Sequence, residues 1–235
     1  MQSDLVENLY DVRRRIASAS TRAGRDQNEI KLIAVSKTHP AETLRKAMNA
    51  GVAVFGENKV QEAESKIGDI GRAKAEWHLI GHLQSNKARK AVQLFDVIHS
   101  VDSLELAERL ERICIEEGRE KLSVFVHVDL AGESSKSGID ESRIDDLVDF
   151  LKTCKRVQFH GLMALPPFFD DAEESRPYFK RLKAIRDDLA SQNAFANGHG
   201  ELSMGMSNDF EIAIEEGATV VRVGTAIFGK RERMA

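Results

Sequence analysis

The feature that most constrains this chain is a regular alternation of short β-rich runs with longer amphipathic segments. Runs rich in β-branched and apolar residues predict eight strands, at about residues 31–37, 52–57, 76–81, 96–101, 122–130, 156–164, 200–206 and 219–224. Helical patterns lie between these runs, and a further helix, closed by Gly24, precedes the first one. The order of the elements therefore predicts an α/β protein.

Eight successive strand–helix units favour a closed barrel over an open sheet. Connections between parallel strands are right-handed, so eight units most simply close into a (β/α)8 TIM barrel. A doubly wound sheet is the alternative, but it usually carries a Gly-rich turn after the first strand, where this chain has SKTHP. Because the sequence shows neither a linker nor a low-complexity run, we expect residues 1–235 to form a single barrel domain with an extra N-terminal helix.

Charge, cysteine content and hydropathy exclude several classes of protein. The chain has 34 Lys and Arg against 38 Asp and Glu, spread along its length, which does not favour nucleic-acid binding. Two distant cysteines, an N-terminus without a signal-peptide pattern and the lack of a long apolar run predict a cytoplasmic protein that does not enter a membrane. The seven histidines form no HExxH motif, so we expect no metal site.

The last two strands are predicted to end in a phosphate site. In TIM barrels the active site lies at the carboxyl ends of the strands, and phosphate sites recur after strands seven and eight, near a short extra helix. The sequence GTAIFG offers Gly224, where a phosphate can approach the backbone, and the hydroxyl of Thr225. Ser207 in GMSND offers a second hydroxyl from the neighbouring loop. Taken alone, Gly224 and Thr225 can also be ordinary turn residues.

Two basic side chains are predicted to point into the same barrel mouth. Alternation along the eighth strand places Arg222 on the same face as Gly224. An inward arginine needs an anion or another acceptor as its partner. The alternative to a bound ligand is a buried carboxylate of the barrel itself. Alternation along the first strand brings Lys37 to the mouth, where partial burial would lower its pKa and free its amine to attack an aldehyde. A strand-end lysine can also be a salt-bridged residue. Together these groups predict a site for a phosphorylated aldehyde.

The same residues belong to motifs that extend along the whole chain. These motifs are, in order, AVSKT, FGENKVQE, WHLIGHLQSNK, SSKSG, GLMA, LSMGMSND and VRVGTAIFG. In order and spacing they resemble the motifs of the YggS/PROSC family of pyridoxal phosphate homeostasis proteins. The resemblance implies a barrel like the N-terminal domain of alanine racemase, with pyridoxal 5'-phosphate (PLP) as its cofactor.

The resemblance also implies which residues hold the cofactor. Lys37 would form an internal aldimine with PLP, and Arg222 would face the pyridine nitrogen. The implied phosphate ligands are Ser207, Gly224 and Thr225. The implied pocket walls are Asn58, His82 and Met163.

Two further positions bear on transfer of the cofactor. Lys136 in SSKSG matches the family motif and is a candidate second amine, although it can equally be a solvated loop lysine. His39 stands where some family members carry a basic residue, which puts a role in transfer at that position in doubt. The expected partners are PLP and the PLP-dependent apoenzymes that receive it, and we expect a monomer or a weak homodimer.

Three functions are compatible with these residues: a non-catalytic PLP carrier, a PLP enzyme such as an amino-acid racemase, and a Schiff-base aldolase. A racemase needs a second acid–base group on the cofactor face opposite the lysine. In alanine racemase an extra β domain supplies that group, whereas this chain stops at KRERMA soon after the eighth predicted strand. The only tyrosines, Tyr10 and Tyr178, fall in helices expected to face away from the mouth. We therefore expect a PLP homeostasis protein without catalytic residues.

Overall fold

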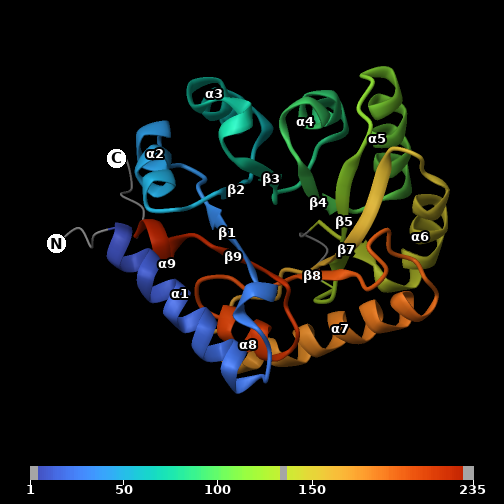
Figure 1. The fold of residues 1–235 in the computed structure, drawn as a ribbon. Helices are drawn as coiled ribbons and strands as arrows, with labels where there is room; N and C mark the ends of the chain where they lie inside the picture. Colours follow the sequence, from blue (N-terminus) through green and yellow to red (C-terminus); the bar gives the residue numbers. More distant parts are fainter. Residues whose placement is uncertain (1–4, 133–136, 230–235) are drawn as a thin grey trace.

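Parallel strands close into a barrel in the computed structural model, which describes residues 5–132 and 137–229 (Figure 1). The barrel strands are β1 (Lys31–Val35), β2 (Val54–Glu57), β3 (Glu76–Leu79), β4 (Val97–Val101), β5 (Leu122–Asp129), β7 (Val157–Met163), β8 (Glu201–Ser203) and β9 (Val220–Val223). Each strand pairs with its neighbours in parallel, and the pairings β1–β9 and β4–β5 close the ring. The prediction of a (β/α)8 barrel with an extra N-terminal helix is confirmed.

The strands differ from the prediction mainly at their carboxyl ends. The first strand was predicted to reach Lys37 but ends at Val35, because residues 36–39 form a turn in which the His39 N–H donates to the Ser36 carbonyl at 3.1 Å. The seventh predicted strand ends at Ser203 rather than residue 206, just before Gly205 with its φ of 91°. A two-residue strand that was not predicted, β6 (Ile139–Asp140), pairs with β5.

The helices surround the barrel on its outside (Figure 1). They are α1 (Leu5–Arg22), α2 (Ala41–Asn49), α3 (Val60–Ile70), α4 (Ala88–Leu94), α5 (Leu104–Glu116), α6 (Ile144–Thr153), α7 (Arg176–Ser191), α8 (Phe210–Glu215) and α9 (Thr225–Phe228). Local signals fix several starts: Pro40 precedes α2, and the Ser103 hydroxyl accepts from the Leu106 N–H to cap α5. The extra helix α1 packs against α8 and α9.

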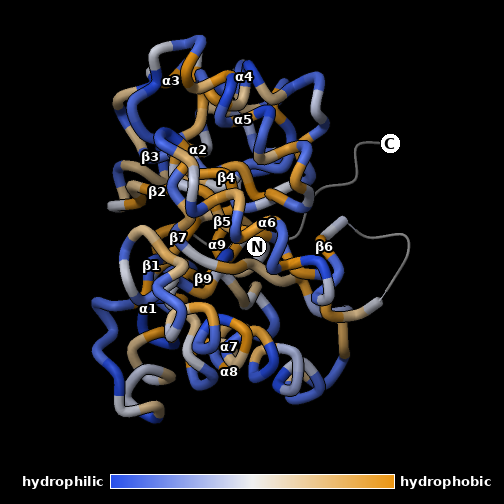
Figure 2. Tube along the Cα trace, turned by 90° about the vertical axis from the view of Figure 1, so that its right-hand side faces the viewer, coloured by the Kyte–Doolittle hydropathy of each residue, from blue (hydrophilic) through white to orange (hydrophobic). Residues whose placement is uncertain are grey.

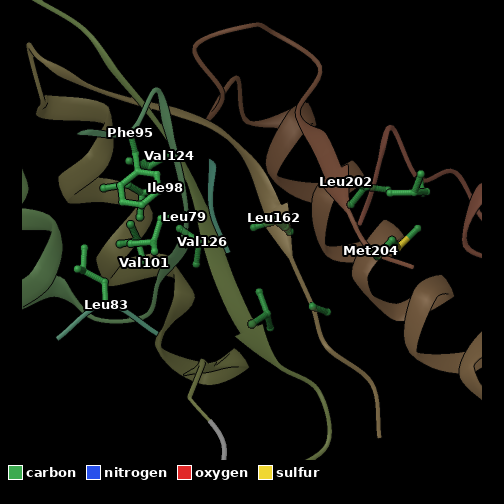
Figure 3. Close-up of a cluster of buried hydrophobic side chains, with 14 of the residues drawn as sticks. Leu79, Leu83, Phe95, Ile98, Val101, Val124, Val126, Leu162, Leu202 and Met204 are labelled. Atoms are coloured by element: carbon green, nitrogen blue, oxygen red, sulfur yellow. The ribbon is translucent and has the colours of Figure 1, made fainter. Parts of the chain in front are cut away.

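Apolar side chains are buried on both faces of the strands. The larger cluster lies between strands and helices, and Figure 3 shows part of it, including Leu79, Ile98 and Leu162. A smaller cluster fills the inside of the barrel with one side chain from each of five strands: Ile33, Val97, Phe125, Met163 and Val220. Figure 2 shows hydrophobic residues concentrated in the central strands and hydrophilic residues mostly toward the outside. Each fully buried large side chain contributes about 1.5–3 kcal/mol.

Candidate functional site

Lys37 lies in the turn that follows β1. The turn runs from Ser36 to His39, and the Lys37 side chain is half-buried. Thr38 has a φ of 68°, in the left-handed region that β-branched residues rarely adopt. The His39 ring stacks on Phe228 of α9 with 4.8 Å between the ring centroids. A strained turn therefore places Lys37 at the carboxyl end of β1, beside the end of β9.

Arg222 is buried inside the barrel, as strand alternation predicted. Its Nη1 donates to the carbonyl and the hydroxyl of Ser203 at 2.6 and 2.5 Å, and its Nη2 donates to the Ala164 carbonyl at 2.9 Å. Burial lowers the pKa of Arg222 to about 10. Within the described residues these hydrogen bonds go to neutral oxygens rather than to a carboxylate, so the alternative of a buried Arg–carboxylate pair is not what the structure contains.

A chain of hydrogen bonds leads from Arg222 through the barrel interior. The Ser203 Oγ lies 2.9 Å from Nδ1 of His99, and His99 Nε2 lies 2.7 Å from Nδ1 of His78. His78 Nε2 lies 2.8 Å from Oε1 of Glu76, at the opposite end of the barrel from the mouth. Sequence reasoning missed this series of hydrogen bonds, although the single histidine among the apolar residues of β3 and of β4 could have indicated inward polar groups.

Donor and acceptor chemistry gives this chain one direction. An arginine can only donate, and the hydrogen bond from His78 lowers the pKa of Glu76 to about 2, so its carboxylate only accepts. Burial lowers the pKa of both His78 and His99, which keeps both rings neutral. Donation therefore runs from Arg222 through Ser203, His99 and His78 to Glu76, with the proton of each histidine on Nε2.

The three predicted phosphate ligands lie together where two loops meet. The Ser207 Oγ accepts from the backbone N–H of Gly224 at 3.2 Å and of Ala226 at 3.3 Å. Thr225 is exposed and begins α9 directly after Gly224. A Cβ on Gly224 would come within 3.3 Å of the Val35 carbonyl, so the backbone of this loop approaches the end of β1 closely.

Asn58 and His82 follow neighbouring strands at the same end of the barrel. Asn58 is half-buried directly after β2, and a Cβ on Gly81 would lie 2.3 Å from its carbonyl oxygen. This close approach requires glycine in the loop that carries His82. The His82 side chain is 53% exposed, with its Nδ1 3.2 Å from Oδ2 of Asp102. Both residues lie at the mouth, His82 on its solvent-facing side.

The remaining predicted residues differ in their placement. Met163 ends β7 and is buried in the apolar cluster inside the barrel, with 1% of its surface exposed. Lys136 lies outside the described residues. Among the residues that the structure does describe, no group of three or more His, Cys, Asp or Glu side chains is arranged to hold a metal ion.

His127 is a further buried polar residue that sequence reasoning missed. It lies in β5 with 4% of its surface exposed, next to Met163 of β7 in the strand register. Burial, followed by the charge of Arg222, lowers the pKa of His127 to about 4. Its Nδ1 has no hydrogen-bond partner among the described residues. A neutral imidazole with a spare nitrogen therefore faces the barrel interior near the buried arginine.

The donor set at the mouth fits a phosphorylated aromatic aldehyde. Lys37 offers an amine, Arg222 a buried donor cation, and the Ser207–Gly224 loops two hydroxyls with backbone N–H groups. Arg222 lies in β9 and the other groups follow β1, β8 and β9, which are neighbours in the sheet. PLP presents an aldehyde, an aromatic ring with a nitrogen acceptor, and a phosphate, and each of these three parts has a matching group here.

Comparison with known proteins defines the class. Residues 8–232 match the family of the alanine racemase N-terminal domain. An alanine racemase of Clostridium difficile shares the fold with a TM-score of 0.73 at 16% identity, over 98% of this chain and 57% of that one. The fold is that of an alanine-racemase-type barrel.

Closer relatives identify the family. A pyridoxal phosphate homeostasis protein of Aquifex aeolicus is 40% identical over 226 residues, which cover 96% of this chain and 98% of that protein. The Escherichia coli protein of the same name is also 40% identical, over 98% of each chain. PipY of Synechococcus elongatus, solved with PLP bound, is 41% identical with a TM-score of 0.81, over 96% of this chain and 100% of that one. The chain belongs to the pyridoxal phosphate homeostasis protein family.

Proposed function

We propose that this protein binds PLP at the barrel mouth as an aldimine of Lys37 and releases it to PLP-dependent apoenzymes. The observation that carries the proposal is the convergence of Lys37, Arg222 and the Ser207–Gly224 loops at the ends of adjacent strands. The names of the relatives and the PLP-bound structure of PipY support it. The protein would thus serve PLP homeostasis rather than catalysis.

Each residue has a role that follows from its chemistry. When bound, PLP would supply an electrophilic aldehyde, with which the neutral Lys37 amine would condense with loss of water. Ser207, Thr225 and the Gly224 backbone would hold the phosphate through hydrogen bonds to a charged group. A donor from Arg222 would meet the ring nitrogen, disfavour its protonation and so weaken the electron-withdrawing power that amino-acid chemistry needs. The proposed pocket walls are Asn58, His82 and Met163.

The aldimine is tested by reduction. We expect borohydride treatment of the PLP-loaded protein, followed by peptide mapping, to place the pyridoxyl group on Lys37. Lys37→Ala should lose the imine absorbance and keep its circular dichroism spectrum, whereas Lys87→Ala, the matched control, should retain both. A pyridoxyl group found only on Lys87 or Lys136 would overturn the assignment.

The choice between carrier and racemase needs a separate experiment. The two tyrosines do not supply an evident second base: Tyr10 is 71% exposed on α1, and the ring of Tyr178 of α7 packs at a tilt against Phe169, with 5.9 Å between the ring centroids. The PLP-loaded protein is incubated in deuterated water with L- and D-amino acids, and α-proton exchange is followed by NMR. We expect no exchange beyond that of free PLP, together with PLP transfer to an apoenzyme. Stereospecific exchange that disappears in Lys37→Ala would establish an enzyme.

We also propose a cytoplasmic setting and a monomer or weak homodimer. In the described ranges both cysteines, Cys114 and Cys154, are free thiols, which suits a reducing compartment. In the same ranges the structure contains no helix with the length and hydrophobicity of a membrane span.

Lys136 is proposed as the second amine in transfer of PLP to an apoenzyme. If Lys136→Ala delivers PLP to an apoenzyme at the wild-type rate, that part of the proposal fails.

A further inference from the structure

A buried cluster of charged side chains lies directly beneath the turn that carries Lys37. Its centre is Lys66 of α3, whose side chain is only 8% exposed. Lys66 Nζ donates to the Ser36 carbonyl at 2.7 Å, to Glu57 Oε1 at 2.7 Å and to Glu62 Oε1 at 2.6 Å. An ammonium group has three N–H donors, so these contacts use all of them. We call Ser36, Glu57, Glu62 and Lys66 the Lys66 cluster.

The Lys66 cluster holds the backbone on both sides of Lys37. Before Lys37, Ser36 is held twice, through its carbonyl by Lys66 and through its hydroxyl, which donates to Glu57 Oε1 at 2.6 Å. After Lys37, the Thr38 N–H donates to the Glu62 carboxylate. Thr38 is the residue with the left-handed φ of 68°, a conformation that costs roughly 1–3 kcal/mol and persists only where the surroundings enforce it. The cluster provides those surroundings.

Fold stability alone does not account for the Lys66 cluster. Glu57 is fully buried, burial raises its pKa, and its second oxygen has no hydrogen-bond partner among the described residues. Replacing a buried ion group by apolar side chains of similar volume is often neutral or stabilising, because the desolvation cost of the charges disappears. The same face of α3 already buries the apolar residues Ala63 and Ile67, so an apolar side chain in place of Lys66 would have apolar neighbours. The charged group is therefore better explained by what it holds in place.

We propose that Lys66, together with Glu57 and Glu62, is a positioning group that fixes the Ser36–His39 turn so that the Lys37 amine meets the aldehyde of PLP in one geometry. This inference rests on the proposed function of Lys37. Lys66 itself is not the nucleophile, because its three donors are engaged below the turn. The cluster acts through the backbone of residues 36 and 38, and a displacement of the reacting amine by about 1 Å can slow a reaction by about 100-fold.

The proposal predicts that imine formation and non-covalent binding respond differently when the Lys66 cluster is disrupted. A general loss of structure would impair both. The proposed ligands of the phosphate and the ring nitrogen lie on β9 and in the loops after β8 and β9, and none of the hydrogen bonds above joins the Lys66 cluster to them. Disrupting the cluster should therefore impair imine formation while leaving non-covalent binding intact. The probe for non-covalent binding is 4'-deoxypyridoxine 5'-phosphate, which keeps the ring and the phosphate and has no aldehyde.

The experiment compares Lys66→Met and Glu62→Ala with the wild type. The matched control is Glu64→Gln, on the same helix, because Glu64 is 49% exposed and pairs with Lys90 rather than with the cluster. The rate of imine formation is followed by absorbance after mixing with PLP, and the Kd of the deoxy probe by fluorescence. We expect imine formation to slow by about 10- to 100-fold in both cluster variants, with the probe Kd within about twofold of wild type and the control unchanged.

A second readout needs no cofactor. In the protein without PLP, acetylation of Lys37 by acetic anhydride is compared with that of Lys87 by mass spectrometry as a function of pH. We expect the Lys37 profile to change in Glu62→Ala and to stay unchanged in Glu64→Gln. If Lys66→Met fails to fold, Glu62→Ala decides, because the Glu62 side chain is 27% exposed and its removal leaves the Lys66–Glu57 pair.

The outcomes distinguish the two proposals. Equal loss of PLP and probe binding, or no change in imine formation and Lys37 labelling, would overturn the positioning role. If the wild type binds neither PLP nor the probe, the proposed function fails. In that case the pH profile of Lys37 acetylation still decides whether the Lys66 cluster controls the reactivity of the Lys37 amine.

Discussion

Arg222 is a cation inside the barrel, and the cost of placing it there explains the residues around it. An unpaired buried charge is expensive, so it must be hydrogen-bonded on every side that water cannot reach. Ser203 and Ala164 supply three acceptors, and the Ser203 hydroxyl passes the polarisation to His99 and His78. Hydrogen bonds in such chains strengthen one another in a medium of low dielectric constant. The series of hydrogen bonds ends on the Glu76 carboxylate, while the charge of Asp209 partly offsets the lowering of the Arg222 pKa by burial.

Removing the Ser203 hydroxyl should show how much the hydrogen bonds from Arg222 to Glu76 contribute to the stability of the fold. Ser203→Ala deletes one of the acceptors of Arg222 Nη1, which keeps the Ser203 carbonyl, and removes the donor to His99 Nδ1, which is left buried without that partner. We expect a loss of about 1–3 kcal/mol in the free energy of unfolding, measured with urea. Ser191→Ala is the control, since within the part of the chain that the structure describes the Ser191 hydroxyl bonds only to the Asp188 carbonyl, at the exposed end of α7, and its loss should change stability little. An equal loss in the free energy of unfolding for Ser203→Ala and Ser191→Ala would contradict a role of the Ser203 hydroxyl in linking Arg222 to His99.

His127 should make stability depend on pH. Burial lowers its pKa from 6.5 to about 4, so the unfolded chain binds the proton more strongly than the folded one. The stabilising contribution is complete above the unfolded pKa and is lost as the pH falls toward the folded pKa. The full difference is about 3 kcal/mol. We expect urea unfolding of His127→Gln to lose less stability over this range than the wild type, and parallel curves would argue against a buried neutral His127.

His199→Gln serves as the control for that comparison, because His199 is exposed and should follow the wild-type curve. His78 and His99 remain in both variants and contribute equally to both curves. The difference between the curves therefore reports on His127 alone.

Single-residue prediction succeeded where strand alternation and loop position were sufficient. The inward direction of Arg222 and the meeting of Ser207 with Gly224 follow from the order of the strands. The hydrogen bonds among His99, Ser203 and Arg222 could not be predicted, because they depend on register between strands far apart in the sequence. The outward position of the His82 side chain likewise depends on loop geometry that strand counting does not provide.

At the scale of elements, the loops after β8 and β9 form one unit. Ser207 from the first loop accepts hydrogen bonds from two backbone N–H groups of the second, which fixes their separation. The second loop is also tied from outside, since the Asn8 side chain of α1 donates to the Ile227 carbonyl in α9 at 3.0 Å. The extra N-terminal helix thereby supports the proposed phosphate site. Strand and helix positions were predicted closely, but this support was not, because it joins residues 219 positions apart.

The paired loops should be selective for the phosphate. We expect Ser207→Ala combined with Thr225→Ala to weaken binding of PLP by about 1–3 kcal/mol for each lost hydrogen bond, with little effect on unphosphorylated pyridoxal. Isothermal titration with both compounds measures the difference. Thr219→Ala, which removes a hydroxyl bonded to the Leu202 N–H at the start of β9, is a control outside the loops. An equal loss for the two compounds would place the phosphate elsewhere.

At the scale of the whole molecule, we propose that residues 1–235 fold as a single domain. The barrel strands share one apolar cluster with the surrounding helices, which favours all-or-none unfolding. Differential scanning calorimetry should therefore show one transition whose calorimetric and van't Hoff enthalpies agree. Saturating PLP at about 100 times its Kd should stabilise the folded state by about 2.7 kcal/mol and move that transition upward as a whole. Two separable transitions would contradict a single domain.

The pairing of β1 with β9 has a consequence for the order of events during synthesis. Lys37 leaves the ribosome before Arg222 and the loop at Gly224, and the register Ile33–Arg222 joins the two regions only when the ring closes. A nascent chain that has exposed β1 but not β9 has the proposed reactive amine without the proposed phosphate ligands. On the proposed function, selective capture of the cofactor is therefore a late event that follows ring closure, and PLP cannot act as a template for the first stages of folding.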